Sequence, residues 1–266
     1  MKKIVLAVVL SLGFAASAQA QFVNGGFENG TFGGWTSGQG EWYGQVGFPL
    51  NSADYLPGGS QYQAAMPTQS AIVGAGQDAI IGATLINGVA FNTVYNGTSA
   101  ARINNSVNDY SVNVISQSVT AYSSNDIFFE WAAVLDSSHG LTDSDHFSLT
   151  LTDDTTNTVL VSRSYSSASA PGTFTALANG WYASGWQVEQ VNVLALGAIG
   201  HDFTLTLLAS DCPYGGHAGY VYLDGFGNVV VPPGPGTSVP EPSSLLLLGS
   251  GLAGLGLLRK KSAAQS

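Results

Sequence analysis

The segment Phe147-Ser148-Leu149-Thr150-Leu151-Thr152 alternates large apolar residues with hydroxyl residues. Residues 203–207 (FTLTL) repeat this alternation, and residues 188–196 show a similar pattern. A period of two built from Phe, Leu, Val and Thr is typical of a β-strand with one face in a core and the other in water. Residues 126–135 (DIFFEWAAVL) are more continuously apolar and predict a central strand. We therefore predict an all-β fold, a single β-sandwich of the jelly-roll type over residues 21–230.

Two further segments qualify this prediction. Residues 153–157 (DDTTN) lie between two alternating runs and predict a hairpin loop. Residues 50–100 are rich in Gly, Ala, Ser and Gln and show no clear period. Within them, residues 71–89 are compatible with strands, with a short helix or with a long ordered loop. No repeat with a period of about 20–50 residues is present, which disfavours a solenoid or a propeller.

Charge is distributed unevenly along the 266 residues. Seventeen acidic and seven basic residues give a formal net charge of −10, and only Arg102 and Arg163 lie outside the two basic ends. Residues 21–238 therefore hold sixteen acids and two bases, a net charge of −14. Such a body repels phosphate backbones, so the sequence excludes nucleic-acid binding. Because this body has no lysine, a P-loop is excluded as well.

The N-terminus has the three-part layout of a secretory signal peptide. A basic pair precedes an apolar run over residues 4–14, and residues 18–20 (AQA) fit the A-x-A cleavage pattern. We expect export through the Sec machinery and removal of residues 1–20 by signal peptidase, which would cut between Ala20 and Gln21. The alternative, an uncleaved membrane anchor, is disfavoured because the apolar run is short.

The C-terminal residues 239–266 also have three parts. Pro240-Glu241-Pro242 is followed by an uncharged stretch, residues 243–258, and then by Arg259-Lys260-Lys261. As a helix the uncharged stretch would span about 24 Å, slightly less than a bilayer core of about 30 Å. Basic residues at its far end place the C-terminus in the cytoplasm. We predict one transmembrane helix over residues 243–258, preceded by a Pro/Gly linker over residues 231–238.

This tail resembles the PEP-CTERM sorting tail of Gram-negative bacteria. Its three parts occur in the family's order, and a predicted signal peptide precedes them. The resemblance implies an exosortase that recognises and cleaves the tail. It also implies transient anchorage in the inner membrane and a final place at the cell surface or in an extracellular exopolysaccharide matrix. The alternative is a plain tail anchor with the same charge layout.

Two other segments carry resemblances. Residues 24–35 (NGGFENGTFGGW) resemble the opening strand of galactose-binding-like and carbohydrate-binding jelly rolls. Residues 211–224 (DCPYGGHAGYVYLD) resemble a segment near the end of β-sandwich modules in large bacterial surface proteins, and the similarity extends back to about residue 128. These resemblances imply a fold and a location rather than a reaction.

Asp211, His217 and Asp224 are candidate metal ligands. Oxygen-rich sites at turns favour Ca²⁺, whereas two histidines would favour zinc. A loop expected to face them carries four further candidates, Asp136, His139, Asp143 and Asp145. The alternative is that these groups only hydrogen-bond the glycine-rich turn. We expect no required cofactor, with a structural Ca²⁺ as the one candidate.

Cys212 is the only cysteine, so the chain can form no internal disulfide. It is interpreted as a small buried residue in a turn. The alternative is a cysteine hydrolase in which His217 activates the thiol, but no supporting motif is present.

Two aromatic pairs, Trp42-Tyr43 and Trp181-Tyr182, stand among small and amide residues. Sugar rings have apolar C–H faces, so exposed pairs of this kind would suit glycan binding. The alternative is that these rings cover the ends of the sheets. Trp186 is interpreted as structural because an alternating strand begins directly after it.

These features predict an exported, exosortase-sorted protein with a non-catalytic β-sandwich that binds glycan, is stabilised by Ca²⁺, or both. One alternative is a secreted hydrolase that acts on glycans through two carboxylates. Its candidates are Glu28, Glu41, Glu130 and Glu189. The other alternative is an acidic structural or adhesive matrix protein that binds Ca²⁺ collectively.

Overall fold

The computed structural model describes most of the predicted sandwich, in the ranges 21–44, 49–137, 139–140, 143–169 and 172–227. The predicted signal peptide, linker, transmembrane helix and sorting tail lie outside these residues. Within the described ranges, no helix is long and apolar enough to cross a membrane.

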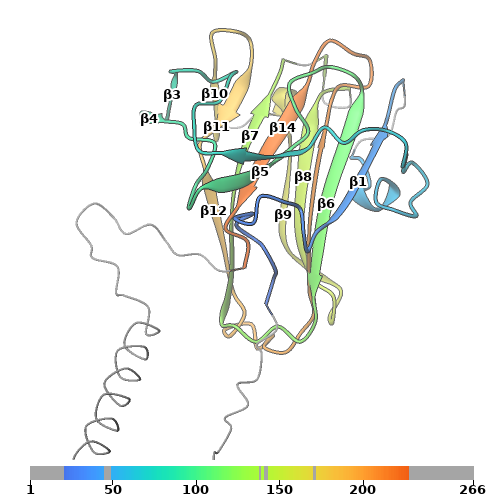
Figure 1. Ribbon diagram of the computed structural model, residues 1–266, viewed down its shortest axis with the longest axis vertical. Coiled ribbons are helices and arrows are strands. Elements are labelled where there is room, and N and C mark those ends of the chain that lie inside the picture. The colour runs from blue at the N-terminus through green and yellow to red at the C-terminus, as the bar shows by residue number, and fades with distance from the viewer. Residues whose placement is uncertain (1–20, 45–48, 138, 141–142, 170–171, 228–266) are drawn as a thin grey trace, which may run out of the picture. The chain divides into compact units, whose positions relative to one another are not determined.

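Two antiparallel sheets face each other (Figure 1). The five-stranded sheet has the order β1 (Thr36–Glu41), β6 (Ser111–Val119), β13 (Phe203–Ser210), β8 (His146–Asp153), β9 (Thr158–Ser166). The seven-stranded sheet has the order β10 (Phe174–Ala176), β11 (Tyr182–Ser184), β7 (Asp126–Leu135), β14 (Gly219–Asp224), β5 (Ser99–Ile103), β2 (Ala71–Gly74), and β12 (Gln187–Asn192) also pairs with β7. A separate hairpin consists of β3 (Leu85–Ile86) and β4 (Val89–Ala90), and the two short 3₁₀ turns are η1 (Ser52–Asp54) and η2 (Ser167–Ser169).

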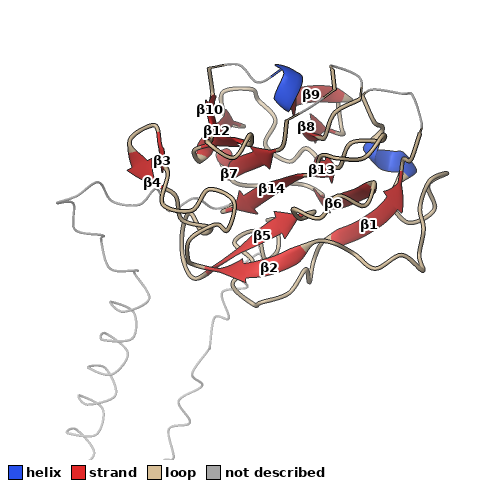
Figure 2. Ribbon diagram, turned by 90° about the horizontal axis from the view of Figure 1, so that it is seen from above, coloured by secondary structure: helices blue, strands red, loops and turns tan. Residues whose placement is uncertain are grey.

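The chain passes repeatedly from one sheet to the other. Strands β5, β6, β7 and β8 alternate between the seven-stranded and the five-stranded sheet, and β12, β13 and β14 do the same. Figure 2 shows the two sheets as stacked layers. This arrangement confirms the predicted jelly-roll sandwich.

Alternation places the core between the sheets. Phe147, Leu149 and Leu151 of β8 are fully buried, and the register sets Leu149 opposite Leu207 and Leu151 opposite Leu205 of β13. Burying each such side chain contributes about 1.5–3 kcal/mol. The intervening hydroxyl residues lie on the outer face, as the sequence predicts.

Residues 24–35 differ from the expected opening strand. They form turns, and β1 begins only at Thr36. The positive φ of Phe27 (56°) and the glycine-rich composition favour turns over an extended chain. The segment instead packs aromatic rings into the core, because Phe27 stacks on Trp35 with ring centroids 5.3 Å apart and Trp35 contacts Phe226.

Residues 50–100 add a partial outer layer to each sheet. On the seven-stranded sheet, Ile81 and Ile86 pack against the outward side chains of β7 and β14. On the five-stranded sheet, Tyr55 packs with Trp42 and with the outward residue Val114 of β6. Most of the segment is therefore ordered loop that covers apolar outer faces, with only short strands.

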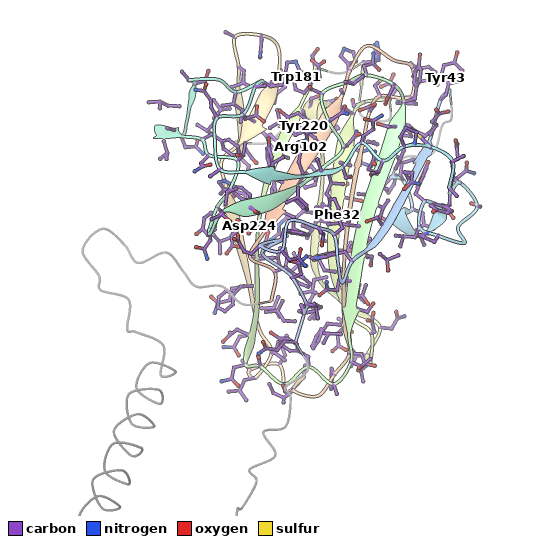
Figure 3. The ribbon with its side chains drawn as sticks, viewed as in Figure 1. Phe32, Tyr43, Arg102, Trp181, Tyr220 and Asp224 are labelled. Atoms are coloured by element: carbon purple, nitrogen blue, oxygen red, sulfur yellow. The ribbon has the colours of Figure 1, made fainter. Side chains whose placement is uncertain are left out.

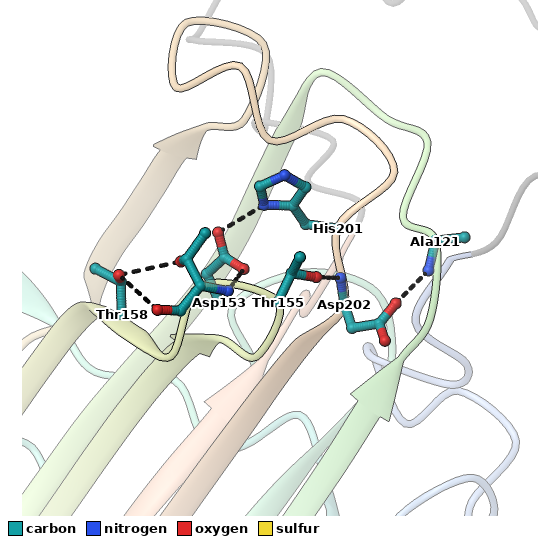
Figure 4. Close-up of polar contacts among 7 residues, drawn as sticks. Ala121, Asp153, Thr155, Thr158, His201 and Asp202 are labelled. Atoms are coloured by element: carbon teal, nitrogen blue, oxygen red, sulfur yellow. Dashed lines mark hydrogen bonds and ion pairs between the residues drawn. The ribbon is translucent and has the colours of Figure 1, made fainter.

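One end of the sandwich is closed by a network of polar loop contacts (Figure 4). The predicted hairpin loop is confirmed between β8 and β9. Its Asp153 accepts a hydrogen bond from Thr156 and pairs with His201 Nδ1 at 2.8 Å. Asp202 accepts from the Ala121 amide at 2.8 Å and donates its own amide to Thr155. These contacts account for His201 as a structural residue.

Candidate functional site

A hollow of about 250 Å³ lies between the outer face of the seven-stranded sheet and the loop over residues 75–95. Its floor comes from β5 and β14, which alternate so that Arg102, Tyr220 and Tyr222 face outward while Val221 and Leu223 enter the core. We call it the Arg102 hollow.

Asp78 ties the covering loop to this floor. One of its oxygens accepts hydrogen bonds from the hydroxyls of Tyr220 (2.8 Å) and Tyr222 (2.6 Å). The other accepts from the amides of Ile80 and Ile81. Burial and the neighbouring Asp78 charge raise the pKa of both tyrosines far above their usual value, so both hydroxyls remain proton donors.

Arg102 is the basic group of this hollow. Its guanidinium lies 5.8 Å from the centre of the Tyr220 ring, and its Nε donates to the carbonyl of Asn104 at 3.2 Å. Among the described residues Arg102 forms no ion pair, whereas Arg163 is paired with Glu189 at 2.7 Å. Arg102 is therefore the cation of the described body that remains available to a ligand.

Two further hollows share lining residues with the first or with each other. A middle one of about 380 Å³ shares Gly76 and Gln77 with the Arg102 hollow. The next, of about 290 Å³, shares Phe91 with the middle one and is also lined by Tyr95 and Trp186. We call the three together the trough, with a polar end at Arg102 and an aromatic end at Trp186.

Trp186 helps to build the aromatic end. Its indole lies parallel to Phe91, with ring centroids 6.0 Å apart and planes 7° apart. Its Nε1 donates to the carbonyl of Asn92 at 2.8 Å, which fixes the ring against the covering loop. The ring is only partly buried, so it has both a structural role and a face that lines the trough.

The four aromatic residues predicted to contact glycan lie in different environments. Trp42 is fully buried and donates its Nε1 to the Asp211 carbonyl at 2.6 Å. Tyr43 is 66% exposed but lies away from the trough (Figure 3). Tyr182 is part-buried on β11, and Trp181 packs 6.2 Å from Tyr220, beside the floor of the trough.

The three predicted metal ligands do not meet in one place. Asp211 lies at the Gly219 end of β14, because Asn104 Nδ2 donates to both Asp211 Oδ1 and the Gly219 carbonyl at 2.9 Å. Asp224 is the last residue of β14, about 16 Å further along an extended chain. His217 belongs to the turn that follows Asp211. Binding of Ca²⁺ itself stays a prediction.

Each of the two aspartates is held by hydrogen bonds. Asp211 Oδ2 accepts from the amides of Asp109 and Ser111, and from the Ser111 hydroxyl. Asp224 Oδ2 accepts from the amides of Tyr95 and Asn96. Burial nevertheless raises the pKa of Asp211 to about 7 and that of Asp224 to about 6.

None of the glutamates considered for glycan hydrolysis lines the trough. Glu189 is ion-paired with Arg163, and Glu41 is exposed at the end of β1 in the other sheet. Glu28 accepts from the amides of Thr98 and Ser99, and Glu130 is a buried cross-strand neighbour of Asp224. The trough is lined by a single carboxylate, Asp78. The geometry therefore gives no support to a pair of catalytic carboxylates there.

Cys212 is fully buried, and its Sγ lies 3.2 Å from His139 Nδ1 and 2.9 Å from the Asp143 carbonyl. Burial raises the pKa of its thiol. A cysteine hydrolase needs a thiolate, which this environment disfavours. The histidine that contacts this cysteine is His139, which comes from the loop that the sequence predicts to face the turn. His217 lies in the same cluster.

Comparison with known proteins identifies the tail. Residues 238–261 match the PEP-CTERM protein-sorting motif, which confirms the resemblance found in the sequence. The motif indicates export and sorting to the cell envelope or surface. No curated protein matches the chain.

Solved structures with a similar arrangement of strands include several carbohydrate-binding modules. TmCBM61, in complex with β-1,4-galactotriose, is 11% identical, with 78% of this chain and 96% of that chain covered and a TM-score of 0.34. CBM28, a module specific for non-crystalline cellulose, is 14% identical, with 78% and 94% covered and a TM-score of 0.35. The K1 cleaved adhesin domain of Lys-gingipain from Porphyromonas gingivalis W83 is 12% identical, with 75% and 92% covered and a TM-score of 0.33. These scores lie below 0.5, so the function proposed below depends on this chain's own residues.

Proposed function

We propose that this protein is exported, processed at its PEP-CTERM tail by an exosortase, and then acts at the cell surface or in the matrix as a non-catalytic glycan-binding protein. The observation that carries the proposal is the trough, which combines aromatic rings at one end with a guanidinium at the other that forms no ion pair among the described residues. Sugar rings present apolar C–H faces to aromatic rings and hydroxyl groups to planar polar side chains.

The two ends of the trough have complementary roles in this proposal. The partly exposed faces of Trp186 and Tyr95 suit stacking by a sugar ring. Arg102 supplies donors for sugar hydroxyls or for a sugar carboxylate. Gln77 is exposed between the two ends and supplies both a donor and an acceptor.

A glycan array probed with the full-length chain, purified in mild detergent, tests the proposal. We expect signal for a subset of glycans, and a loss of at least about ten-fold in affinity in Trp186→Ala and Arg102→Ala, since each removes about 1.4 kcal/mol or more of contact. Tyr43→Ala is the matched control, because it deletes an exposed aromatic ring outside the trough. Gln77→Ala is a milder variant that leaves the packing intact. A flat array, or equal losses in Tyr43→Ala, would refute the trough as a glycan site.

Tail processing has a separate test. The double variant Pro240→Ala with Glu241→Ala should accumulate as an uncleaved, membrane-held form in a host that contains an exosortase. If this variant still loses its tail, processing by an exosortase is the wrong explanation.

A structural Ca²⁺ remains a second proposal, at a different set of residues. Glu130 is 1% exposed, and its Oε1 has no hydrogen-bond partner among the described residues. It lies opposite Asp224 in the register, and Asp224 Oδ1 and the Glu28 side chain both approach Gly26. A buried carboxylate without a partner beside a second one is the kind of environment that Ca²⁺ neutralises. Ca²⁺ should raise the melting temperature, and a shift that is absent in the wild type or unchanged in Glu130→Gln would refute this site.

A further inference from the structure

His139, Cys212 and His217 form a cluster outside the trough. One nitrogen from each histidine and the cysteine sulfur all lie within 4.8 Å of one another. His139 Nδ1 is 3.2 Å from Cys212 Sγ, and the two imidazole rings meet edge to face with centroids 4.5 Å apart. The chain has four histidines in all, and this cluster contains two of them together with the only cysteine.

The local backbone explains why these residues meet. Cys212 and His217 lie at the two ends of a tight turn, because the Cys212 amide donates to the His217 carbonyl at 3.0 Å. Gly215 and Gly216 close the turn with φ values of 81° and 92°, a conformation that favours glycine. His139 comes from the loop between β7 and β8, and that loop is fastened to the turn where the Asp143 carbonyl accepts from the Cys212 thiol.

One atom of the cluster lacks any other role. His217 Nδ1 is buried and has no hydrogen-bond partner among the residues that the structure describes. A buried polar atom without a partner costs about 1–3 kcal/mol, so native proteins rarely retain one without a function. A metal ion held by Cys212 and His139 would give this nitrogen a partner.

We propose that His139, Cys212 and His217 bind a thiophilic transition-metal ion of the Zn²⁺ class. Zinc takes sulfur at about 2.3 Å and nitrogen at about 2.0–2.1 Å, which places tetrahedral ligand atoms about 3.3–3.7 Å apart. The His139 Nδ1–Cys212 Sγ distance of 3.2 Å lies just below this range, and all three ligand atoms lie within 4.8 Å of one another, so small side-chain rotations bring the cluster to that geometry. Two nitrogens and one sulfur select zinc-class ions over Ca²⁺, which prefers oxygen.

Three protein ligands leave a fourth position, which water or another group can take. Binding replaces the Cys212 thiol proton, which passes to solvent, and leaves a thiolate on the metal. With two neutral imidazoles, the bound divalent ion carries one net positive charge. Asp136 and Asp143 act electrostatically on His217, so this charge would lie among carboxylates.

Titration of the reduced full-length chain with Co²⁺, a spectroscopic substitute for zinc, tests the proposal. We expect one equivalent to produce a thiolate-to-cobalt charge-transfer band that one equivalent of Zn²⁺ removes and that excess Ca²⁺ leaves unchanged. Cys212→Ser should abolish the band, and His139→Ala should weaken Co²⁺ binding at least about ten-fold.

Two variants keep the test decisive. His139 is exposed, so its replacement by alanine perturbs the fold little even if Cys212→Ser is unstable. His201→Ala is the matched control, because His201 pairs with Asp153 at the opposite end of β8 and should leave Co²⁺ binding unchanged. Absence of the band in the wild-type chain would overturn the proposal. A band that persists with full affinity when His139 and His217 are both replaced would overturn it too.

Discussion

Replacing Glu130 by glutamine should stabilise the protein at neutral pH when metal ions are chelated. Glu130 is 1% exposed, and burial, with the neighbouring Asp224 charge as a second cause, raises its pKa from the usual 4.5 to about 8. The folded state therefore favours the protonated acid. In the unfolded chain the same group ionises near pH 4.5. The contribution of Glu130 to the free energy of unfolding is therefore fully present below pH 4.5. It is lost progressively as the pH rises towards 8.

The size of the effect follows from this pKa. Each pH unit between the unfolded and folded pKa values costs about 1.36 kcal/mol, so the loss from pH 4.5 to pH 7 is about 3 kcal/mol. Glutamine keeps the shape of the side chain but has no charge to lose. The variant should therefore exceed the wild type by about 3 kcal/mol at pH 7, or roughly 6–12 °C in melting temperature for a domain of this size. At pH 4.5 the difference should be small.

Urea unfolding in the presence of EDTA, repeated between pH 4.5 and pH 8, measures this. The exposed Glu41→Gln, which removes a similar charge at the end of β1, is the control and should follow the wild type. Asp211 and Asp224 stay in the variant and keep a shallower slope up to about pH 7. The reasoning fails if Glu130→Gln shows the wild-type slope, or if it is no more stable than the wild type at pH 7.

Three further predictions concern packing, hydrogen bonding and charge. Asn104→Ala removes a buried amide that donates to Asp211 and to the Gly219 carbonyl, and should cost about 2–4 kcal/mol in urea unfolding, since it leaves buried partners unsatisfied. Gly25→Ala should lower the free energy of unfolding by several kcal/mol because its Cβ would overlap the carbonyl oxygen of Phe226. The control is Gly76→Ala, where a Cβ meets nothing within 4 Å. It should change the thermal stability by no more than about 1 kcal/mol. Solubility, followed by light scattering, should fall as the pH approaches the sequence pI of about 4.4, and a minimum near neutral pH would contradict this.

The inner faces of the sheets were predictable from sequence, and the outer layers were not. In residues 147–152 a period of two directly reports burial on one side, so the strand and its inward face follow from the pattern alone. Residues 75–95 lack any period because they are mostly loop, with only the short β3–β4 hairpin, and their apolar residues contact the sheet one at a time. Trp42 illustrates the consequence. Its neighbours in sequence give no sign of burial, yet Tyr55 from the following loop, Val114 of β6 and Leu208 of β13 pack around it.

The candidate sites show the same division. Because side chains alternate along a strand, the pattern of residues 219–224 predicts that Tyr220 and Tyr222 share one face and Val221 and Leu223 the other. Arg102 can be singled out because it is one of only two basic residues outside the two ends of the chain. Their meeting with Asp78 depends on how the covering loop folds, which local patterns do not encode. The sequence places Asp211 and Asp224 in one motif and so predicts that they share a site. In the structure, Asp211 and Asp224 lie at opposite ends of the six-residue strand β14, so the two carboxyl groups are close in sequence but far apart in space.

The attachment of the covering loop through Asp78 has an evolutionary consequence. The core between the sheets contains no residue from positions 75–94, so this stretch can accept substitutions and changes of length while the core keeps its packing. Evolution can therefore change the lining of the trough without loss of the core packing that stabilises the fold. Tyr220 and Tyr222 lie on the sheet and provide two hydroxyl donors that stay in place. A covering loop of different sequence can bind them if it supplies an acceptor in the position of Asp78.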